Sequence, residues 1–210
     1  MENPLRTGGR DPGLRLIETF AGNAPAARIE RHLARMTRGA QALGWEFGRP
    51  AVLAALAPLR GQALRLRLTL DRAGTVRAES APLPAPPALW QVAVAAPRLA
   101  AADPWLKLKS TRRAGHDAAR AALAPGTHEA ILVNQHGEAC EGTISTLFFD
   151  RGAGLRTPPL SCGLLPGILR EELLEQGAAQ EEPLAAADLP RVRLWMGNSL
   201  RGLIPARLAA

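Results

Sequence analysis

The chain has 210 residues, of which 47% are apolar, so it can bury a substantial hydrophobic core in one large domain or two small ones. It carries 26 basic and 19 acidic residues, a net charge of +7, but the basic residues are scattered, which argues against a dedicated nucleic-acid-binding arm. Because it lacks the apolar segment of a signal peptide and any unbroken run of ~18 apolar residues, we expect a cytoplasmic protein without membrane spans.

The first third of the chain predicts a mixture of strands and helices. A short strand over 14–22 leads to an amphipathic helix over 28–44, which ends at Gly44, and a shorter helix follows over 50–59. Alternating residues then predict a hairpin of strands over 63–70 and 75–80. The apolar face predicted for the long helix consists of Ile29, Leu33, Met36, Ala40 and Leu43.

The densest proline stretch, APLPAPPAL at 81–89, cannot lie inside a helix or a central strand, so it predicts a domain linker. We therefore expect a small N-terminal domain over residues 1–84 and a larger, β-rich domain over residues 85–210. Strands and helices alternate without strict βαβ order in either part, which indicates the α+β class. The elements predicted in the larger domain are strands at 90–97, 106–111, 128–134, 138–142, 145–150 and 192–197, and helices at 112–123 and 168–177.

The segment LKLKSTRR contains Lys107 and Lys109, and every other basic residue of the chain is an arginine. Arginine replaces lysine on a solvated surface, but it cannot replace an amine that must lose its proton and attack a carbonyl. On the predicted strand, Lys107, Lys109 and Thr111 would project to one face. The alternative is chance, because a composition this rich in arginine leaves few lysines anywhere.

Three further features are each weak alone. Glu141 follows a predicted strand in ACEGTISTLFF, where a glutamate is more often solvated than catalytic. Pro166-Gly167 leads into a helix whose first backbone N–H groups could bind a phosphate. Asn198 and Ser199 supply polar donors after the last predicted strand. The two cysteines match neither a zinc site nor a disulfide framework, the four histidines are dispersed, and no metal is predicted.

In order along the chain, the motifs LIET, RIERHLARM, LKLKSTRR, HEAILVNQHGEACEGTISTLFF, TPPLSCGLLPGILR and NSLRGLIPA resemble the class IV aminotransferase family, the fold-type IV enzymes that use pyridoxal 5′-phosphate (PLP). The resemblance runs from about Leu16 to Leu208. It implies a small N-terminal α/β domain, a larger β-rich PLP-binding domain, a cofactor between the two, and a homodimer.

The resemblance also implies roles for individual residues. Lys109 matches the Schiff-base lysine, and Glu141 matches the carboxylate that hydrogen-bonds the pyridine nitrogen. Lys107 has no family role, although its charge could lower the pKa of Lys109. The residues that match the phosphate-binding positions are Arg35, the backbone of Ile168 and Leu169, and the pair Asn198 and Ser199. Many family members have threonine where Leu169 stands, and the chain has no tyrosine to fill the roles that relatives give to that residue.

The NSL ending resembles the 4-amino-4-deoxychorismate lyase branch, which implies release of pyruvate and 4-aminobenzoate. The alternative is an amino-acid transaminase of the branched-chain or D-amino-acid type. Arg112 and Arg113 could bind a carboxylate of a small anionic amino substrate, or they could be solvated residues at a helix start. A relative that holds PLP without turnover is a further alternative. A basic nucleic-acid-binding protein is favoured only by charge, because few aromatic residues are available for stacking.

Overall fold

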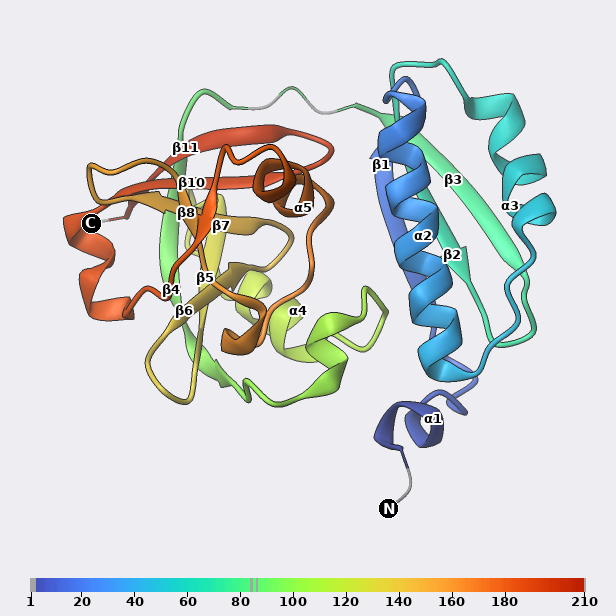
Figure 1. The fold of residues 1–210 in the computed structure, drawn as a ribbon, viewed down its shortest axis with the longest axis horizontal. Helices are drawn as coiled ribbons and strands as arrows, with labels where there is room; N and C mark the ends of the chain where they lie inside the picture. Colours follow the sequence, from blue (N-terminus) through green and yellow to red (C-terminus); the bar gives the residue numbers. More distant parts are fainter. Residues whose placement is uncertain (1–2, 84, 86, 210) are drawn as a thin grey trace. The chain divides into compact units, whose positions relative to one another are not determined.

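The computed structural model describes residues 3–83, 85 and 87–209 (Figure 1). The chain forms two compact units. The first contains Met1–Pro84 and Leu108–Arg112, and the second contains Ala85–Lys107 and Arg113–Ala210. Pro84 and Pro86, within the predicted linker, lie outside the described residues. None of the described helices is long and apolar enough to cross a membrane.

The first unit contains a three-stranded antiparallel sheet in the order β1-β2-β3, with helix α2 packed against β1 (Figure 1). Strand β2 alternates as LRLRLTL, and its Leu66, Leu68 and Leu70 are fully buried while the residues between them are more exposed. The elements of this unit are α1 (Pro4–Gly8), β1 (Leu16–Ala21), α2 (Ala26–Leu43), α3 (Arg49–Leu56), β2 (Leu64–Leu70) and β3 (Val76–Pro82).

Helix α2 confirms the predicted amphipathic pattern. All five residues of its predicted apolar face are buried, with exposed fractions of 4% or less. The helix ends at Gly44, whose φ of 69° lies in the left-handed region, and the Gly44 N–H donates to the carbonyls of the last turn. A residue with a Cβ would be strained at this position.

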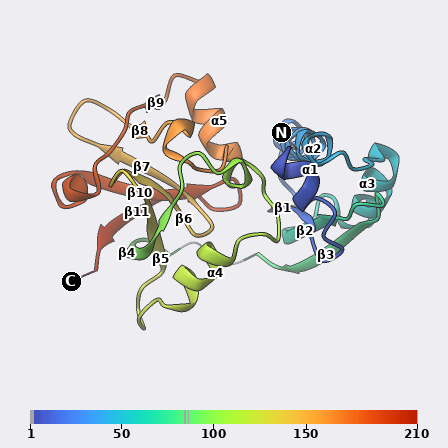
Figure 2. The same ribbon diagram turned by 90° about the horizontal axis from the view of Figure 1, so that it is seen from below.

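The second unit is built around an eight-stranded sheet in the order β10-β11-β4-β5-β6-β7-β8-β9. An additional antiparallel pairing of β10 with β7 closes six of these strands into a barrel-like ring. Helix α4 packs against β4 and β5, whereas α5 packs against β10, on the other side of the unit (Figure 2). The elements are β4 (Trp90–Leu99), α4 (Ala114–Ala121), β5 (Glu129–Asn134), β6 (Ala139–Gly142), β7 (Thr146–Asp150), β8 (Arg156–Thr157), α5 (Ile168–Glu175), β9 (Gln180–Glu181), β10 (Arg193–Asn198) and β11 (Gly202–Leu208).

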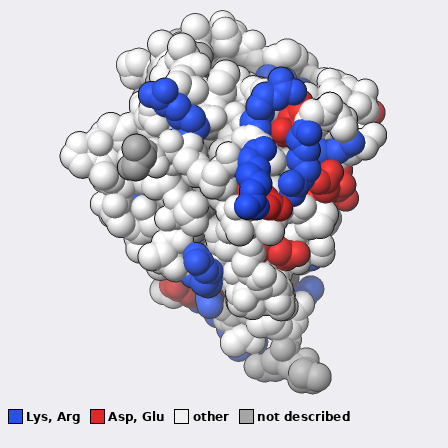
Figure 3. All heavy atoms as spheres, turned by 90° about the vertical axis from the view of Figure 1, so that its left-hand side faces the viewer, with Lys and Arg blue, Asp and Glu red and all other residues white. Residues whose placement is uncertain are grey.

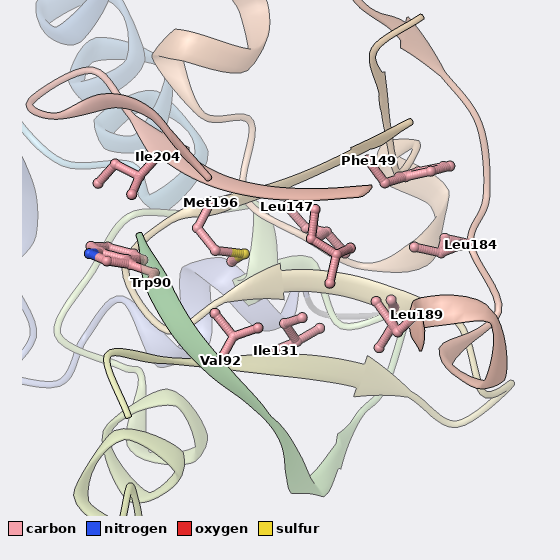
Figure 4. Close-up of a cluster of buried hydrophobic side chains, with 11 residues drawn as sticks. Trp90, Val92, Ile131, Leu147, Phe149, Leu184, Leu189, Met196 and Ile204 are labelled. Carbon is pink, nitrogen blue, oxygen red and sulfur yellow. The ribbon is translucent and has the colours of Figure 1, made fainter. Parts of the chain in front are cut away.

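Two apolar clusters form the core of the second unit, and strand β5 contributes to both. Its Ile131 lies in the cluster where side chains of β4, β7, β10 and β11 point toward one another (Figure 4). Its Ala130 and Leu132 lie in a second cluster with Cys140 and Cys162. Both faces of β5 are therefore covered, which explains why its sequence, EAILVN, is almost continuously apolar.

The α+β class predicted from the sequence is confirmed.

The predicted strand over 106–111 is wrong. Asp103 accepts a hydrogen bond from the Trp105 N–H at 3.0 Å, and Pro104 follows it, so the chain starts a 3₁₀ turn over Pro104–Lys107. Beyond this turn the chain is extended only beside β1, where Ser110 forms a single bridge with Leu16. The exposed Lys107 belongs to the turn, so the prediction that it shares a strand face with Lys109 is also wrong.

Strand β11 was not predicted from the sequence, although it pairs with β10 and, in parallel, with β4. Its Pro205 has no N–H group to donate and argues against a central strand. The structure accommodates this proline opposite Trp195 of β10, and the parallel pairing with β4 begins only at Ala206. The ring of strands depends on this element, because it joins β10 to β4.

Candidate active site

Lys109 is held by its backbone to the outer edge of β1 in the first unit. The Lys109 carbonyl accepts a hydrogen bond from the Ile17 N–H at 2.8 Å, and the Thr111 N–H donates to the Arg15 carbonyl at 2.8 Å. The Thr111 hydroxyl accepts from the Arg15 N–H at 2.9 Å. The chain is therefore fixed at the carbonyl of the candidate lysine and again at Thr111, two residues later.

Arg35, the predicted phosphate anchor, belongs to a buried charged cluster with Glu18 and His32 in the first unit. Its Nε and Nη2 atoms donate to the two Glu18 carboxylate oxygens at 2.8 and 2.7 Å. His32 Nδ1 lies 2.5 Å from Glu18 Oε2, and Glu18 and His32 are each 1% exposed. Glu18 thus fixes the plane of the Arg35 guanidinium.

Burial alone would raise the pKa of the Glu18 carboxyl. The charges of Arg35 and His32, together with their hydrogen bonds, outweigh burial and lower the pKa from 4.5 to about 2. The lowered pKa means that folding favours the ionised carboxyl. The stabilisation it brings is fully present above pH 4.5 and is lost as the pH falls toward 2.

Glu18→Gln is expected to reduce the pH dependence of stability in acid. Between pH 4.5 and about 2 the wild type should lose about 3 kcal/mol more unfolding free energy than the variant. The measurement is urea unfolding of both proteins at a series of pH values across that range. Parallel stability curves for the two proteins would contradict the assignment of the lowered pKa to Glu18.

Glu141 lies on β6 in the second unit and is 6% exposed. Its Oε1 atom is 3.0 Å from His116 Nε2, and its Oε2 atom accepts a hydrogen bond from the Leu165 N–H at 3.2 Å. A carboxylate has about four acceptor positions, so these two contacts leave room for a further donor. Glu141 can therefore accept an N–H from a bound ring nitrogen while staying fixed in orientation.

The loop after Glu141 is organised by a second buried carboxylate, Glu129, which is fully buried on β5. Glu129 accepts hydrogen bonds from the N–H groups of Thr143 and Ile144 at 2.9 and 3.2 Å. It also accepts from the hydroxyl groups of Thr143 and Ser145, the latter at 2.8 Å. The loop that joins β6 to β7 is thus built around one carboxylate.

The predicted phosphate-binding segments at Ile168–Leu169 and Asn198 are brought together in the second unit. A Cβ on Gly197 would lie 2.8 Å from Leu169 Cδ2 and 2.9 Å from the Gly202 carbonyl oxygen, so β10 passes close to the start of α5 and a larger residue at position 197 would force a shift. Within the described chain no side chain caps this helix at Gly167, so the first N–H groups of α5 remain available to an anion.

Asn198 also ties these segments to the loop after Glu141. Its side-chain amide donates to the Ile144 carbonyl at 3.1 Å, and its Oδ1 atom accepts from the N–H groups of Leu200 and Arg201. One amide hydrogen is left for a ligand. Ser199 lies in the turn between β10 and β11 that these bonds stabilise.

The two predicted substrate-binding arginines lie in different units. Arg112 belongs to the first unit and Arg113 to the second. Arg113 donates from Nε to Asp117 Oδ1 at 2.7 Å and from Nη2 to the Thr143 carbonyl at 2.8 Å. Two of its three nitrogens therefore support α4 and the loop after Glu141.

Sequence reasoning missed Glu18, Glu129 and His116. Each is joined to its partners across 14 to 25 residues of sequence, so no local spacing signals the contact. A buried strand beginning with a glutamate, as in HEAILVN, was the one available sign of an internal carboxylate. Cys140 lies in the core, and burial raises the pKa of its thiol to about 12.

The basic residues do not form one continuous positive surface on the face drawn in Figure 3, where positive and negative groups lie side by side. Ion pairs of the second unit account for several of them. They join Arg151 to Glu182 and Asp188, Arg156 to Glu182, Arg191 to Asp188, and Arg193 to Asp150. Arg151, Arg156, Arg191 and Arg193 are thus each paired with a neighbouring carboxylate.

The groups of the second unit fit PLP, the cofactor that the sequence resemblance implies. PLP carries a ring nitrogen that requires an acceptor when protonated, and a phosphate that requires several donors. Glu141 offers the acceptor. The start of α5, close to the end of β10, offers the donors.

Comparison with known proteins agrees with this fit. Residues 16–209 match the family model described as amino-transferase class IV, a family of PLP-dependent lyases and transferases. An aminodeoxychorismate lyase of Bacillus subtilis is 32% identical over 87 residues, which are 37% of this chain and 28% of that protein. The aligned part is thus under a third of that relative's length.

Solved structures extend the similarity to nearly the whole chain. A protein of Mesorhizobium loti, provisionally assigned as an amino-acid aminotransferase, has a TM-score of 0.86 and 40% identity, covering 93% of this chain and 100% of that one. The 4-amino-4-deoxychorismate lyase of Pseudomonas aeruginosa has a TM-score of 0.78 and 26% identity, covering 92% of this chain and 82% of that one.

Proposed function

Since the chain belongs to the amino-transferase class IV family, we propose that it is a PLP-dependent 4-amino-4-deoxychorismate lyase, which releases pyruvate and 4-aminobenzoate. The observation that carries the cofactor assignment is the buried Glu141 carboxylate, held with an open acceptor position in the unit that also contains the start of α5. The lyase assignment is supported by the NSL sequence at the end of β10 and by the lyases among the similar proteins.

Lys109 is the proposed catalytic residue. Its amine would hold the cofactor covalently and would serve as the base that takes the proton from the substrate α-carbon. When bound, PLP supplies an electron sink for the bonds of that carbon. Glu141 accepts the N–H of the ring nitrogen and keeps the ring cationic, which maintains the sink. Both roles rest on the match of these residues to the family motifs.

The remaining proposed contacts hold the ends of the ligands. Arg35 binds the cofactor phosphate with the guanidinium that Glu18 orients. The phosphate donors proposed in the second unit are Ile168, Leu169, Asn198 and Ser199. Arg112 and Arg113 are the proposed contacts for a substrate carboxylate, Arg113 through Nη1 because its other nitrogens are bonded to Asp117 and Thr143.

An amino-acid transaminase of the branched-chain or D-amino-acid type is the second candidate. It is favoured by the similarity to the Mesorhizobium loti protein, which combines 40% identity with full coverage of that chain. The two reactions share Lys109 and Glu141, so these residues do not distinguish them. The homodimer and the cytoplasmic location expected from the sequence stay predictions.

An assay with both classes of substrate tests the proposal. The purified protein with added PLP is expected to form equal amounts of pyruvate and 4-aminobenzoate from 4-amino-4-deoxychorismate. Its turnover of branched-chain and D-amino acids with 2-oxoglutarate is expected to be at least about 100-fold lower in kcat/KM, a gap of roughly 3 kcal/mol in transition-state stabilisation. Faster keto-acid formation than pyruvate release would establish the transaminase instead. Absence of bound PLP would refute both reactions.

A further inference from the structure

The contact between His116 and Glu141 has no role in the proposed function as stated above. We propose that His116 is a positioning residue that orients the Glu141 carboxylate for the cofactor ring nitrogen. This inference rests on the proposed function, since it concerns the residue that accepts the ring N–H. It is carried by the 3.0 Å distance between His116 Nε2 and Glu141 Oε1, by the burial of Glu141, and by the partial burial of His116, whose side chain is 15% exposed.

The role proposed for Glu141 sets the direction of this hydrogen bond. An ionised carboxylate only accepts, so Nε2 of His116 must carry the hydrogen. The Leu165 N–H occupies the other oxygen at 3.2 Å, so each oxygen of Glu141 has one donor from the protein. Two donors on opposite oxygens restrict rotation of the carboxylate.

The other charged groups of α4 are directed elsewhere. Arg113 donates to Asp117 and to the Thr143 carbonyl, and Arg120 donates to the Thr143 hydroxyl at 3.0 Å and lies 3.5 Å from Glu129. Among the residues that the structure describes, His116 is thus the side chain of α4 that hydrogen-bonds Glu141.

A histidine suits this position better than an arginine would. A guanidinium would form a full ion pair with Glu141 and compete with the cationic cofactor ring for the same negative charge. An imidazole donates one hydrogen bond to one oxygen of Glu141 and does not form the bidentate pair of a guanidinium. Acceptor positions of Glu141 therefore remain for a protonated ring nitrogen.

The experiment measures PLP affinity by absorbance titration for wild type, His116→Leu and His116→Gln. His116→Leu removes the donor and should weaken PLP binding about tenfold, in line with the loss of one hydrogen bond to a charged group. His116→Gln keeps an N–H near the position of the imidazole Nε2 and should stay within about threefold of wild type. Urea unfolding of each protein without cofactor shows whether the variants fold.

A double-mutant cycle shows whether His116 acts through Glu141. In a Glu141→Gln background, His116→Leu should cause no further loss of PLP affinity, because the interaction is already removed. The same tenfold loss in that background would overturn the proposal, as would unchanged affinity in the single variant. If His116→Leu does not fold, His116→Asn, whose amide is too short to reach Oε1, provides the same comparison. If wild type itself binds no PLP, the proposed function fails instead.

Discussion

Replacing Lys109 by alanine is expected to abolish turnover of both candidate substrates, with kcat lowered by at least about 10³-fold. Alanine has no amine, so it can neither hold the cofactor covalently nor accept the proton from the substrate α-carbon. No arginine can take over, because its guanidinium stays protonated. The variant should also lose the visible absorbance of covalently bound cofactor and the mass increase that borohydride reduction fixes in the wild type.

Lys107→Ala is the matched control. Lys107 is exposed at the end of the Pro104–Lys107 turn, and it is the other lysine of the chain. Its replacement should leave the covalent link unchanged and change kcat by less than about threefold, as expected for a residue without an acid–base role. Peptide mapping after borohydride reduction identifies the modified lysine. Cofactor attached at Lys107, or still attached in Lys109→Ala, would contradict the assignment.

Glu129→Gln is expected to destabilise the second unit by about 3 kcal/mol or more. The buried carboxylate accepts from two N–H groups and two hydroxyl groups of Thr143, Ile144 and Ser145. Glutamine would replace one oxygen by an NH2 group that faces donors, which leaves buried donors unsatisfied. A neutral side chain avoids the cost of burying a charge, but four lost or weakened charge-assisted bonds outweigh that gain.

Urea unfolding of Glu129→Gln and wild type at neutral pH measures this effect. Glu182→Gln serves as the control within the same unit, because Glu182 is 36% exposed and pairs with Arg151 and Arg156 near the surface. Its loss should cost less than about 1 kcal/mol, as is typical of exposed ion pairs. Equal losses in the two variants would show that the loop after Glu141 does not depend on Glu129.

The local pattern of the sequence predicted those elements whose burial is regular. The buried residues of helix α2 keep the helical spacing over more than two turns, and those of strand β2 alternate over its seven residues. The packing of both elements in the fold agrees with these patterns. The strand predicted around Lys107 is wrong, because the alternating pattern there is short and Asp103-Pro104 starts a turn. The sequence did not predict strand β11, because its pairing with β4 depends on closure of the ring of strands and not on a pattern in its own residues.

The residues of the candidate site were likewise predicted only in part from the sequence. The family motifs identified Lys109 and Glu141, and the sequence after Pro166-Gly167 predicted the helix that begins at Ile168. The contacts that orient Glu141 and Arg35 came only from the structure. His116 reaches Glu141 from an element 25 residues earlier, and Glu18 reaches Arg35 across 17 residues. Such pairs depend on how helices pack on sheets, which single-sequence patterns do not encode.

The attachment of residues 109–111 to β1 affects how the first unit would behave if it folded on its own. In the sheet order β1-β2-β3, β1 is an edge strand, and its outer N–H and C=O groups would be open to pairing with another chain. The Ile17 and Arg15 backbone groups are instead used by Lys109 and Thr111. A fragment that stops at the proline stretch would lack this cover and expose an aggregation-prone edge. The short segment that carries the proposed catalytic lysine therefore also protects the sheet edge of the unit that precedes it in the sequence.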